Sequence, residues 1–330
     1  MKKAIYAVMM LVLASSLLFA QGAKDPDLAA SFMAKPETEV RVAALKGPTA
    51  MGLSDLIDRS QAGALNGNRY SFQLEGAVDA VTPLVVKGDV DFAALPANLA
   101  AVLYKNTSGK VQVVGINTLG VLYIVENGSS VSSVEDLRGK TIYSAGKGAT
   151  PEYALNYILG SNGLEIGKDV FIEWKSEHAE CVAALAADSD AVAMLPQPFA
   201  TTAMMKNSSM RTALDLNKLW EEKVGSVLIT GVTVVRREFA ENNPDALKAF
   251  LEDYAASVNT VNTDNARGAK LVGGLGIVPE QVALKALPFC NITLITGEEM
   301  KEALSNYLSI LFEQNPKSVG GALPGEDFYL

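Results

Sequence analysis

Two short signatures each occur twice in this chain, in the same order and about 100 residues apart. The first reads Lys46-Gly47-Pro48-Thr49 and recurs as Lys147-Gly148-Ala149-Thr150. The second reads Ala94-Leu95-Pro96 and recurs as Met194-Leu195-Pro196. Because each copy follows an apolar run, the chain is expected to build one strand–loop–helix unit twice, in two similar lobes with equivalent loops. A cleft between such lobes is where small ligands usually bind.

The order of apolar and polar segments predicts the fold class. Strands are expected at 40–45, 70–74, 91–95, 111–116, 141–145, 170–174 and 191–195, and helices at 50–60, 78–87, 97–104, 151–159, 180–187 and from 199 onward. This alternation predicts α/β lobes with mostly parallel sheets flanked by helices. Apolar runs at 119–125 and 226–236 are expected to be the two crossings between the lobes, and the rest of the chain is expected to be helical, at 244–261, 266–275, 279–286 and 298–313. Both signatures lie at carboxyl ends of strands, where ligands of such sheets bind.

The N-terminal segment has the pattern of a secretory signal peptide. Lys2 and Lys3 precede an uncharged, mostly apolar run, and small residues permit cleavage after Ala20 or Gly22. The run is short for a membrane span, so a cleaved leader is favoured over an uncleaved anchor. No cysteine precedes Cys181, which excludes a lipid-anchor cysteine at the N-terminus. The expected domains are a leader (1–22), a tether (23–37), lobe one (38–118 with 232–330) and lobe two (119–231).

Charge and residue usage exclude several function classes. The formal net charge is −9, which argues against nucleic-acid binding, since that calls for basic stripes. Neither a zinc-type His/Cys cluster nor a Gly-x-Ser-x-Gly motif is present, and His178 is the single histidine. No catalytic residue, metal site or cofactor is therefore predicted. Cys181 and Cys290 are predicted to be free, buried thiols, because a disulfide would tie together lobes that have to move.

The repeated loops supply the candidate ligand contacts. Each glycine lets the backbone turn, and Thr49 and Thr150 are expected to cap the following helices, leaving first-turn amides to meet a ligand. The predicted ligand-binding residues are Gly47, Pro48, Thr49, Pro96, Asn98, Asn117, Thr150, Glu152, Tyr153, Gln197 and Phe199. Simple capping remains the alternative for the threonines, and core packing remains the alternative for Tyr153 and Phe199. Lys46 and Lys147 are expected to face solvent, with attraction of an anion as the alternative, and His178 is expected to be a surface or hydrogen-bonded residue near the cleft mouth.

The whole pattern resembles the periplasmic solute-binding proteins of ABC importers, within the group that binds nitrate, sulfonates, taurine and thiamine-pyrimidine precursors. The resemblance covers roughly residues 38–315 and is carried by 134–141 (VEDLRGKT), 148–153 (GATPEY) and 193–198 (AMLPQP). It implies a two-lobed type II periplasmic-binding-protein fold with two crossover strands at the hinge. It also implies a monomeric periplasmic receptor that closes on a small solute and delivers it to a permease driven by an ATPase. Loops 47–51, 95–98, 117–119, 148–153 and 196–199 would line its cleft.

One side chain departs from what an anion binder would require. Glu152 follows the second threonine, where a carboxylate would repel an anion, and this favours a neutral or cationic heterocycle over a sulfonate. The rival function is an enzyme on the same two-lobed fold, as in pyrimidine or menaquinone pathways, but such enzymes are cytoplasmic and a leader argues against them. A third possible function is the effector domain of a transcription factor. Such a protein carries an N-terminal DNA-binding helical unit, and in this chain the predicted leader occupies that position.

Overall fold

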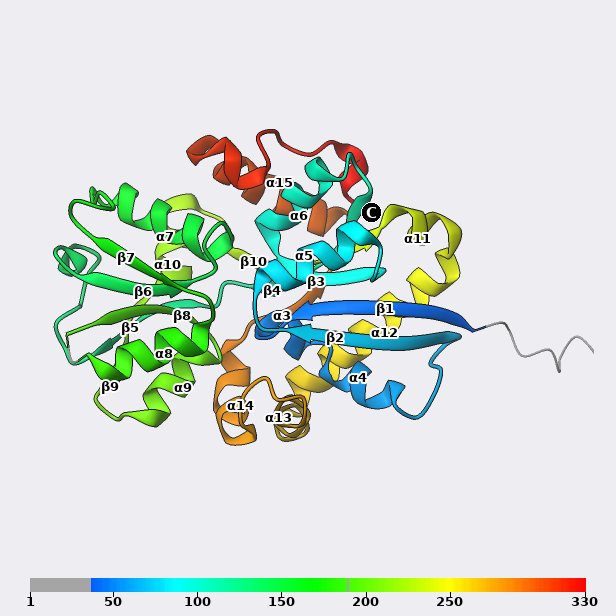
Figure 1. Ribbon diagram of the computed structural model, residues 1–330, viewed down its shortest axis with the longest axis horizontal. Helices are drawn as coiled ribbons and strands as arrows, with labels where there is room; N and C mark the ends of the chain where they lie inside the picture. Colours follow the sequence, from blue (N-terminus) through cyan, green and yellow to red (C-terminus); the bar gives the residue numbers. More distant parts are fainter. Residues whose placement is uncertain (1–36, 189) are drawn as a thin grey trace, which may run out of the picture. The chain divides into compact units, whose positions relative to one another are not determined.

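The computed structural model of the protein describes residues 37–188 and 190–330 and contains two sheets flanked by helices (Figure 1). The larger sheet has the order β11 (Ile292–Ile295), β4 (Val111–Leu119), β10 (Ile229–Arg236), β3 (Phe92–Pro96), β1 (Thr38–Leu45) and β2 (Asn68–Glu75). The smaller sheet has the order β7 (Phe171–Lys175), β6 (Thr141–Ala145), β8 (Val192–Pro196), β5 (Leu122–Asn127) and β9 (Met210–Asp215). The two predicted lobes are therefore present. The predicted leader, and all of the predicted tether except its last residue, lie outside the described residues.

The helices follow the strands in the predicted alternation. Those beside the larger sheet are α3 (Pro48–Met51), α4 (Ser54–Ser60), α5 (Val78–Lys87), α6 (Ala97–Asn106), α11 (Arg237–Asn242), α12 (Pro244–Thr263), α13 (Asn265–Gly274), α14 (Glu280–Ala286) and α15 (Gly297–Gln314). Those beside the smaller sheet are α7 (Thr150–Ser161), α8 (His178–Ala187), α9 (Phe199–Lys206) and α10 (Leu216–Val224). Short 3-10 turns occur at η1 (Glu135–Leu137), η2 (Leu287–Phe289), η3 (Pro316–Val319) and η4 (Glu326–Phe328). Within the described ranges, no helix combines the length and the apolar character that a membrane crossing requires.

Each sheet is mixed, with a parallel half and an antiparallel half. β1 pairs in parallel with β2 and β3, and β6 with β7 and β8, as the strand–helix alternation predicts. β10 is antiparallel to β3 and β4, and β5 is antiparallel to β8 and β9. The sheets are thus less parallel than expected. The chain leaves the larger sheet along β4 and comes back beside it along β10, and two such strands run in opposite directions.

Three short elements escaped the sequence analysis. The region between α9 and β10 contains β9 and α10, and the part of the chain expected to be entirely helical contains the four-residue strand β11. β11 pairs with β4, where Ile292 faces Thr118. Its extended conformation is therefore stabilised by a partner far away in sequence, and a four-residue apolar stretch gives no local sign of it.

A pair of neighbouring strands connects the two sheets. β4 leaves the larger sheet and the chain continues as β5 of the smaller sheet, while β10 returns beside β4 with Ile229 opposite Leu119. Gly231 of β10 has no room for a side chain, because a Cβ atom there would lie 2.6 Å from Thr49 Cγ2 and still closer to Asn117 Oδ1. The close packing around Gly231 thus holds the first repeated loop against the returning strand.

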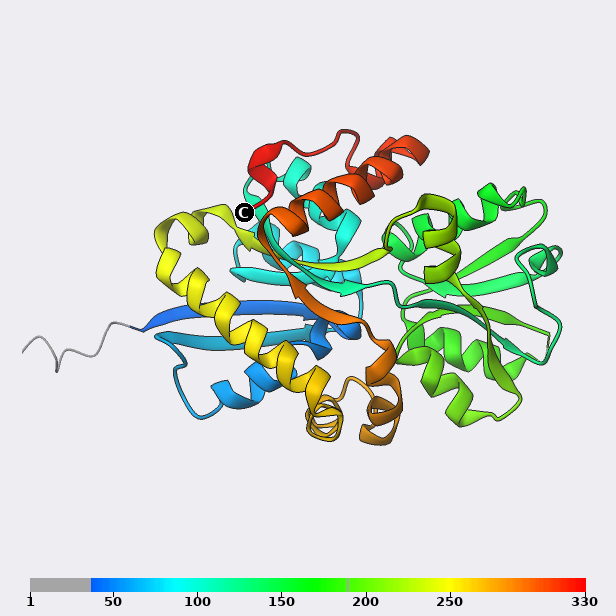
Figure 2. The ribbon, with the colours of Figure 1, turned by 180° about the vertical axis from the view of Figure 1, so that it is seen from behind.

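The largest apolar cluster runs through both lobes. It includes Leu95 and Leu304 beside the larger sheet and Ile142 and Leu155 in the smaller-sheet lobe. α15 joins the two groups: in the view of Figure 2 it lies on the near side of the larger-sheet lobe and runs toward the other lobe. There the ring of Tyr307 lies 5.5 Å from that of Trp220 in α10, centroid to centroid. Both rings are buried.

The cysteines are free and buried, as predicted. Cys181 lies in α8 and Cys290 lies just after η2, and both are 0% exposed. Burial raises the pKa of the Cys181 thiol to about 12, so this thiol stays protonated at neutral pH.

Candidate functional site

Two glycines shape the repeated loops. Gly47 follows β1 with a φ of 136°, and Gly148 follows β6 with a φ of 78°. Both angles lie in the region that residues with a Cβ atom rarely adopt, so the turn from strand to helix requires glycine at each place. Pro48 and Pro151 then stand in the first turns of α3 and α7, where a missing N–H costs nothing.

The predicted threonine caps are wrong. The residues at the N-cap positions of α3 and α7 are Gly47 and Ala149, and neither helix has a side-chain cap. Thr49 already lies inside the first turn, where its Oγ1 donates to the carbonyl oxygen of Leu45 at 2.7 Å. Thr150 is also inside its helix, and its Oγ1 donates to Asn98 Oδ1 at 3.3 Å. Both hydroxyls therefore have protein partners instead of capping an amide.

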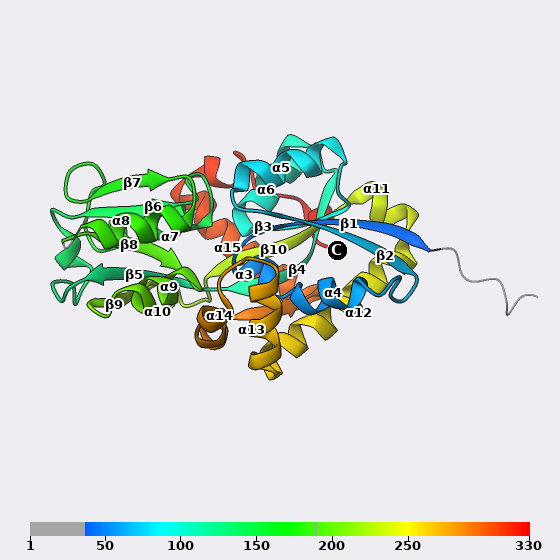
Figure 3. The same ribbon diagram turned by 60° about the horizontal axis from the view of Figure 1, so that its bottom comes forward.

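Six helices begin beside the same space. α3, α5 and α6 follow β1, β2 and β3 on one side, and α7, α8 and α9 follow β6, β7 and β8 on the other (Figure 3). Two adjoining cavities lie between them, of about 200 and 60 Å³, and four residues line both: Leu45, Pro96, Pro151 and His178. Residues from both lobes thus form one cleft at the carboxyl ends of the parallel strands.

The charge of the cleft lining has the opposite sign to that of the chain. Lys46, Lys147 and Lys175 line it, against two carboxylates, Asp79 and Glu177, which leaves a formal excess of one positive charge. The whole chain carries −9. Lys175 Nζ lies 2.6 Å from Glu173 Oε1, and this hydrogen bond raises the pKa of the lysine. Lys46 is partly exposed and Lys147 is exposed, as expected, and both also line the cleft.

His178 lies at the centre of the lining. Its ring packs against that of Phe199 with 5.2 Å between the centroids, and its Nδ1 is covered without a hydrogen-bond partner. Burial lowers the pKa of His178 to about 4, so the imidazole is neutral at neutral pH. The ring as a whole is partly exposed and lines both cavities. The sequence indicated that His178 lies near the cleft, because this residue comes just after a strand, β7, at the start of α8.

The structure brings only some of the predicted ligand contacts to the cleft. Pro48, Thr49, Pro96 and Phe199 line it. Gly47 shapes the loop without lining a cavity. Four others are buried and hydrogen-bonded within the protein: Asn98, Asn117, Thr150 and Gln197. Gln197, for example, accepts at Oε1 from the hydroxyl of Thr201 at 2.8 Å.

Glu152 and Tyr153 also have other roles. The Glu152 carboxylate turns back and accepts a hydrogen bond from the backbone N–H of Gly148, so it closes its own loop and lines neither cavity. Tyr153 points to the far side of α7, where it lines a separate hollow with Tyr157 and Gln314 of α15. Glu152 and Tyr153 are consecutive residues of α7 and so project about 100° apart around the helix, and sequence alone does not show which face of α7 meets α15.

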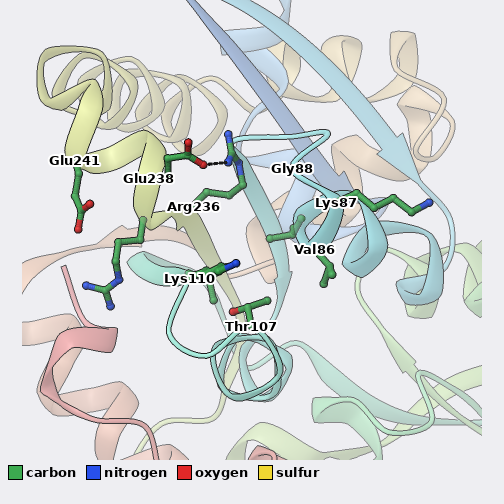
Figure 4. A pocket seen from close by; sticks show the side chains of 11 residues that line it. Val86, Lys87, Gly88, Thr107, Lys110, Arg236, Glu238 and Glu241 are labelled. Atoms are coloured by element: carbon green, nitrogen blue, oxygen red, sulfur yellow. Dashed lines mark hydrogen bonds and ion pairs between the residues drawn. The ribbon is translucent and has the colours of Figure 1, made fainter.

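A larger cavity lies elsewhere, and Figure 4 shows it. It measures about 380 Å³ and is lined by the ends of α5 and α6 and by Lys110, Arg236 and Glu238. Two of its cations have partners: Arg236 donates to Glu238 at 3.1 Å and to Asp91 at 2.8 Å, and Arg237 pairs with Asp327 at 2.7 Å (Figure 4 shows the Arg236–Glu238 pair). Neither repeated loop reaches it. We therefore take the cleft, although smaller, as the candidate site. In the described part of the chain, no cluster of three or more His, Cys, Asp or Glu residues is arranged to hold a metal ion.

Comparisons with known proteins give a consistent result. The family model described as "ABC transporter, phosphonate, periplasmic substrate-binding protein" matches residues 66–279. An ABC transporter protein from Parabacteroides distasonis superposes with a TM-score of 0.73 at 24% identity, covering 89% of this chain and 99% of that one. The search of curated proteins returned no match.

Two further solved structures share the fold at lower identity. The alkanesulfonate-binding protein SsuA from Xanthomonas axonopodis pv. citri, bound to MOPS, has a TM-score of 0.68 at 17% identity and covers 88% of this chain and 96% of its own. The periplasmic nitrate-binding protein NrtA from Synechocystis PCC 6803 has a TM-score of 0.61 at 14% identity, and the match covers 80% of this chain and 74% of that one. At these identities the likeness shows the common two-lobed fold.

Proposed function

Because the chain belongs to the family of periplasmic substrate-binding proteins of phosphonate-type ABC transporters, we propose that its cleft captures a small organic oxyanion for import. The chemical class is a phosphonate or a sulfonate, which carries three oxygens at one end. The observation that carries this proposal is the convergence of six helix N-termini on one cleft whose lining has a formal excess of one positive charge in an acidic chain.

Helix N-termini favour anions because their first-turn N–H groups have no partner within the helix. Each is worth about 0.3–1 kcal/mol to a nearby negative charge, but α3 is only four residues long and Pro48 and Pro151 bring no N–H, so the helix ends supply only part of the binding free energy. Micromolar affinity needs about 8 kcal/mol. The lysines and the neutral imidazole of His178 are the groups that would supply the rest, since hydrogen bonds to charged partners contribute about 1.5–3 kcal/mol each.

The sequence analysis expected the Glu152 carboxylate to repel an anionic ligand, but the observed position of this carboxylate removes that objection. It rested on the Glu152 carboxylate facing the ligand, whereas this carboxylate accepts from Gly148 N–H outside both cavities. The descriptions of related proteins point the same way: the matched family is a phosphonate one, and the two named receptors bind alkanesulfonates and nitrate. All of these ligands are anions.

The remaining parts of the proposal go beyond the family assignment and rest on the sequence pattern. The protein acts as a monomeric, non-catalytic receptor, exported through a cleaved leader to the periplasm, and hands its ligand to a permease powered by an ATPase. Family membership supports a receptor over an enzyme of the same fold. A ligand recovered unchanged by NMR after prolonged incubation with the protein would agree with this, and turnover would contradict it.

A thermal-shift screen followed by calorimetry tests the ligand class. The library holds methylphosphonate, ethylphosphonate, ethanesulfonate, nitrate, sulfate, thiamine-pyrimidine precursors and uracil. At 100 times its dissociation constant a ligand stabilises the protein by about 2.7 kcal/mol, which raises Tm by several degrees. We expect shifts from the phosphonate or sulfonate series. Shifts confined to neutral or cationic heterocycles would contradict the proposal.

The substitution Lys147→Ala tests the positive lining. It removes a charge from the cleft, and we expect the Kd of the best oxyanion to rise about ten-fold, equivalent to about 1.4 kcal/mol. Lys168→Ala is the matched control, since Lys168 lies in the same lobe, pairs with Glu165 at 3.1 Å and lines neither cavity. Equal affinities for the two variants by calorimetry would argue against anion binding at this position.

A further inference from the structure

The two adjoining cavities of the cleft differ in the character of their lining. Among the described residues, four charged side chains line the larger cavity: Asp79, Lys147, Lys175 and Glu177. Within the same part of the chain, one charged side chain, that of the partly exposed Lys46, lines the smaller cavity, whose other lining residues are mostly apolar. We call the larger cavity the charged chamber and the smaller one the hinge chamber.

The hinge chamber lies at the strands that connect the two lobes. Thr118 of β4, Leu122 of β5 and Thr230 of β10 line it, whereas no described residue of these three strands lines the charged chamber. When lobes close around a ligand, atoms near the hinge move less than atoms far from it. The hinge chamber therefore changes shape least between open and closed forms, and its size depends little on how far apart the lobes are without a ligand.

The hinge chamber offers few hydrogen-bond donors to an oxyanion. The hydroxyls of Thr49, Thr118 and Thr230 all donate to oxygen atoms of the protein, and the prolines of its wall have no N–H. An anion that leaves water without such donors meets a large desolvation cost. The charged chamber, where Lys147 and Lys175 supply ammonium groups, is therefore the better place for the charged end of a ligand.

The carboxylates of the charged chamber do not exclude an anion from it. Asp79 and Glu177 are both exposed, so water and salt screen their repulsion. Val78 and Asp79 begin α5 and also line this chamber, and the N–H groups of a first helical turn have no partner within the helix. Donors from both lobes thus meet at the charged chamber.

We propose that the hinge chamber binds the organic part of the ligand and selects short alkyl chains of about two or three carbons, while the oxyanion end lies in the charged chamber. The inference rests on the oxyanion function proposed above and adds which members of that class the cleft prefers. The hinge chamber measures about 60 Å³, and a water-sized group occupies about 30 Å³. About two methyl or methylene groups therefore fill it, and a further carbon lies at the junction of the two chambers.

The wall of the hinge chamber has little freedom to adapt to a longer chain. Four of its residues are prolines, which have no side-chain rotamers to change: Pro48, Pro96, Pro151 and Pro196. Phe199 is the largest side chain of the wall, and its ring packs against that of His178 with 5.2 Å between the centroids. Phe199 is therefore the residue that sets the length of chain the chamber accepts.

The first test is calorimetry with methane-, ethane-, propane-, butane- and hexanesulfonate and with the corresponding alkylphosphonates. Burying one methylene group strengthens binding about four-fold, which corresponds to about 0.8 kcal/mol. We expect the Kd to fall about four-fold with each added carbon up to two or three carbons and then to stop falling. A Kd that does not depend on chain length, or one that keeps falling through hexanesulfonate, overturns the proposal.

The substitution Phe199→Ala tests the wall of the hinge chamber. We expect the Kd to level off at longer chains, so that the ratio of the propanesulfonate Kd to the hexanesulfonate Kd rises about ten-fold. Phe171→Ala is the matched control, since Phe171 belongs to the same lobe, is 46% exposed and lines neither chamber. General damage would weaken all chain lengths alike, so an unchanged ratio in Phe199→Ala overturns the proposal. Phe199→Leu, with a smaller expected rise, decides if the alanine variant does not fold.

The substitution Lys46→Ala tests which end of the ligand enters the hinge chamber. Lys46 lines that chamber and Lys147 lines the charged one, so we expect Lys46→Ala to raise the Kd less than Lys147→Ala does. A larger rise for Lys46→Ala would place the oxyanion in the hinge chamber and overturn the proposal. Binding of all chain lengths with one affinity defeats the subsite and leaves the oxyanion function intact, whereas no binding by any sulfonate or phosphonate defeats both.

Discussion

At the residue scale, His178 combines a partly exposed ring with an Nδ1 atom that is covered and unpaired. Its neutral form offers either a donor or an acceptor to a ligand, depending on the tautomer. The ring contact with Phe199 fixes its position from the neighbouring helix α9. A single histidine beside a cavity is therefore a useful probe of the cleft.

The substitution His178→Gln should remove part of the pH dependence of stability. Burial lowers the pKa of His178 from 6.5 to about 4, so below pH 6.5 the unfolded chain binds a proton that the folded protein does not. Wild-type stability therefore falls as the pH drops from 6.5 toward 4, with on the order of 1–2 kcal/mol from this residue, because the ring is partly exposed. Urea unfolding at pH 7.5 and 5 measures the difference. Identical pH profiles for wild type and variant would refute this account.

The substitution Gly231→Ala should destabilise the protein by about 1–3 kcal/mol, the usual cost of overpacking a filled interior. The new methyl group would overlap Thr49 and Asn117. Gly160→Ala is the control, since Gly160 is an exposed residue of α7 with open space around it, and alanine there is neutral or stabilising by up to about 1 kcal/mol. Urea midpoints of the two variants give the comparison, and similar midpoints would count against close packing at Gly231.

Single residues also show where sequence patterns stop being informative. The patterns correctly placed the glycine turns, because a strand followed by Gly and then by a helix has few alternatives. They misplaced the hydroxyls of Thr49 and Thr150, which bond Leu45 and Asn98. The second of these partners comes from the other lobe, and a local motif cannot identify a partner 52 residues away.

At the element scale, the prediction of strands and helices succeeded wherever an apolar run was bounded by glycine or proline. β1, β3, β6 and β8 are such runs, and each ends at a repeated signature. β11 and β9 were missed, since short strands at the edges of sheets depend on distant partners for their pairing. The antiparallel direction of β5 and β10 was also missed. It depends on how the chain passes between the two sheets, which the local sequence of a strand does not show.

The N-terminus of α7 permits a test of the Glu152 side chain. Replacing Glu152 with glutamine keeps an acceptor for Gly148 N–H but removes the charge near a helix N-terminus. We expect a loss of about 0.5–1 kcal/mol in stability and less than a three-fold change in the Kd of the best oxyanion. Thermal unfolding and calorimetry provide both values. A ten-fold gain in oxyanion affinity would instead place the carboxylate in the cleft.

At the scale of the whole molecule, the shared core has a thermodynamic consequence. One apolar cluster contains buried residues of both sheets and of α15, so neither lobe can lose its packing without exposing that of the other. We expect a single cooperative unfolding transition, with equal calorimetric and van't Hoff enthalpies in differential scanning calorimetry. Two resolved transitions, or different urea midpoints by circular dichroism and tryptophan fluorescence, would show that the lobes unfold independently.

The pairing of β4 with β10 has a consequence for the construction of new receptors. The chain leaves the larger sheet at Leu119 and returns opposite it at Ile229, on directly adjacent strands. Everything between these points forms an insertion whose two attachment points are neighbours, only about 5 Å apart as in any strand pair. Such a segment is a natural unit of recombination. Grafting the corresponding segment of a related protein between these two strands would produce chimeras that keep one wall of the cleft and exchange the other.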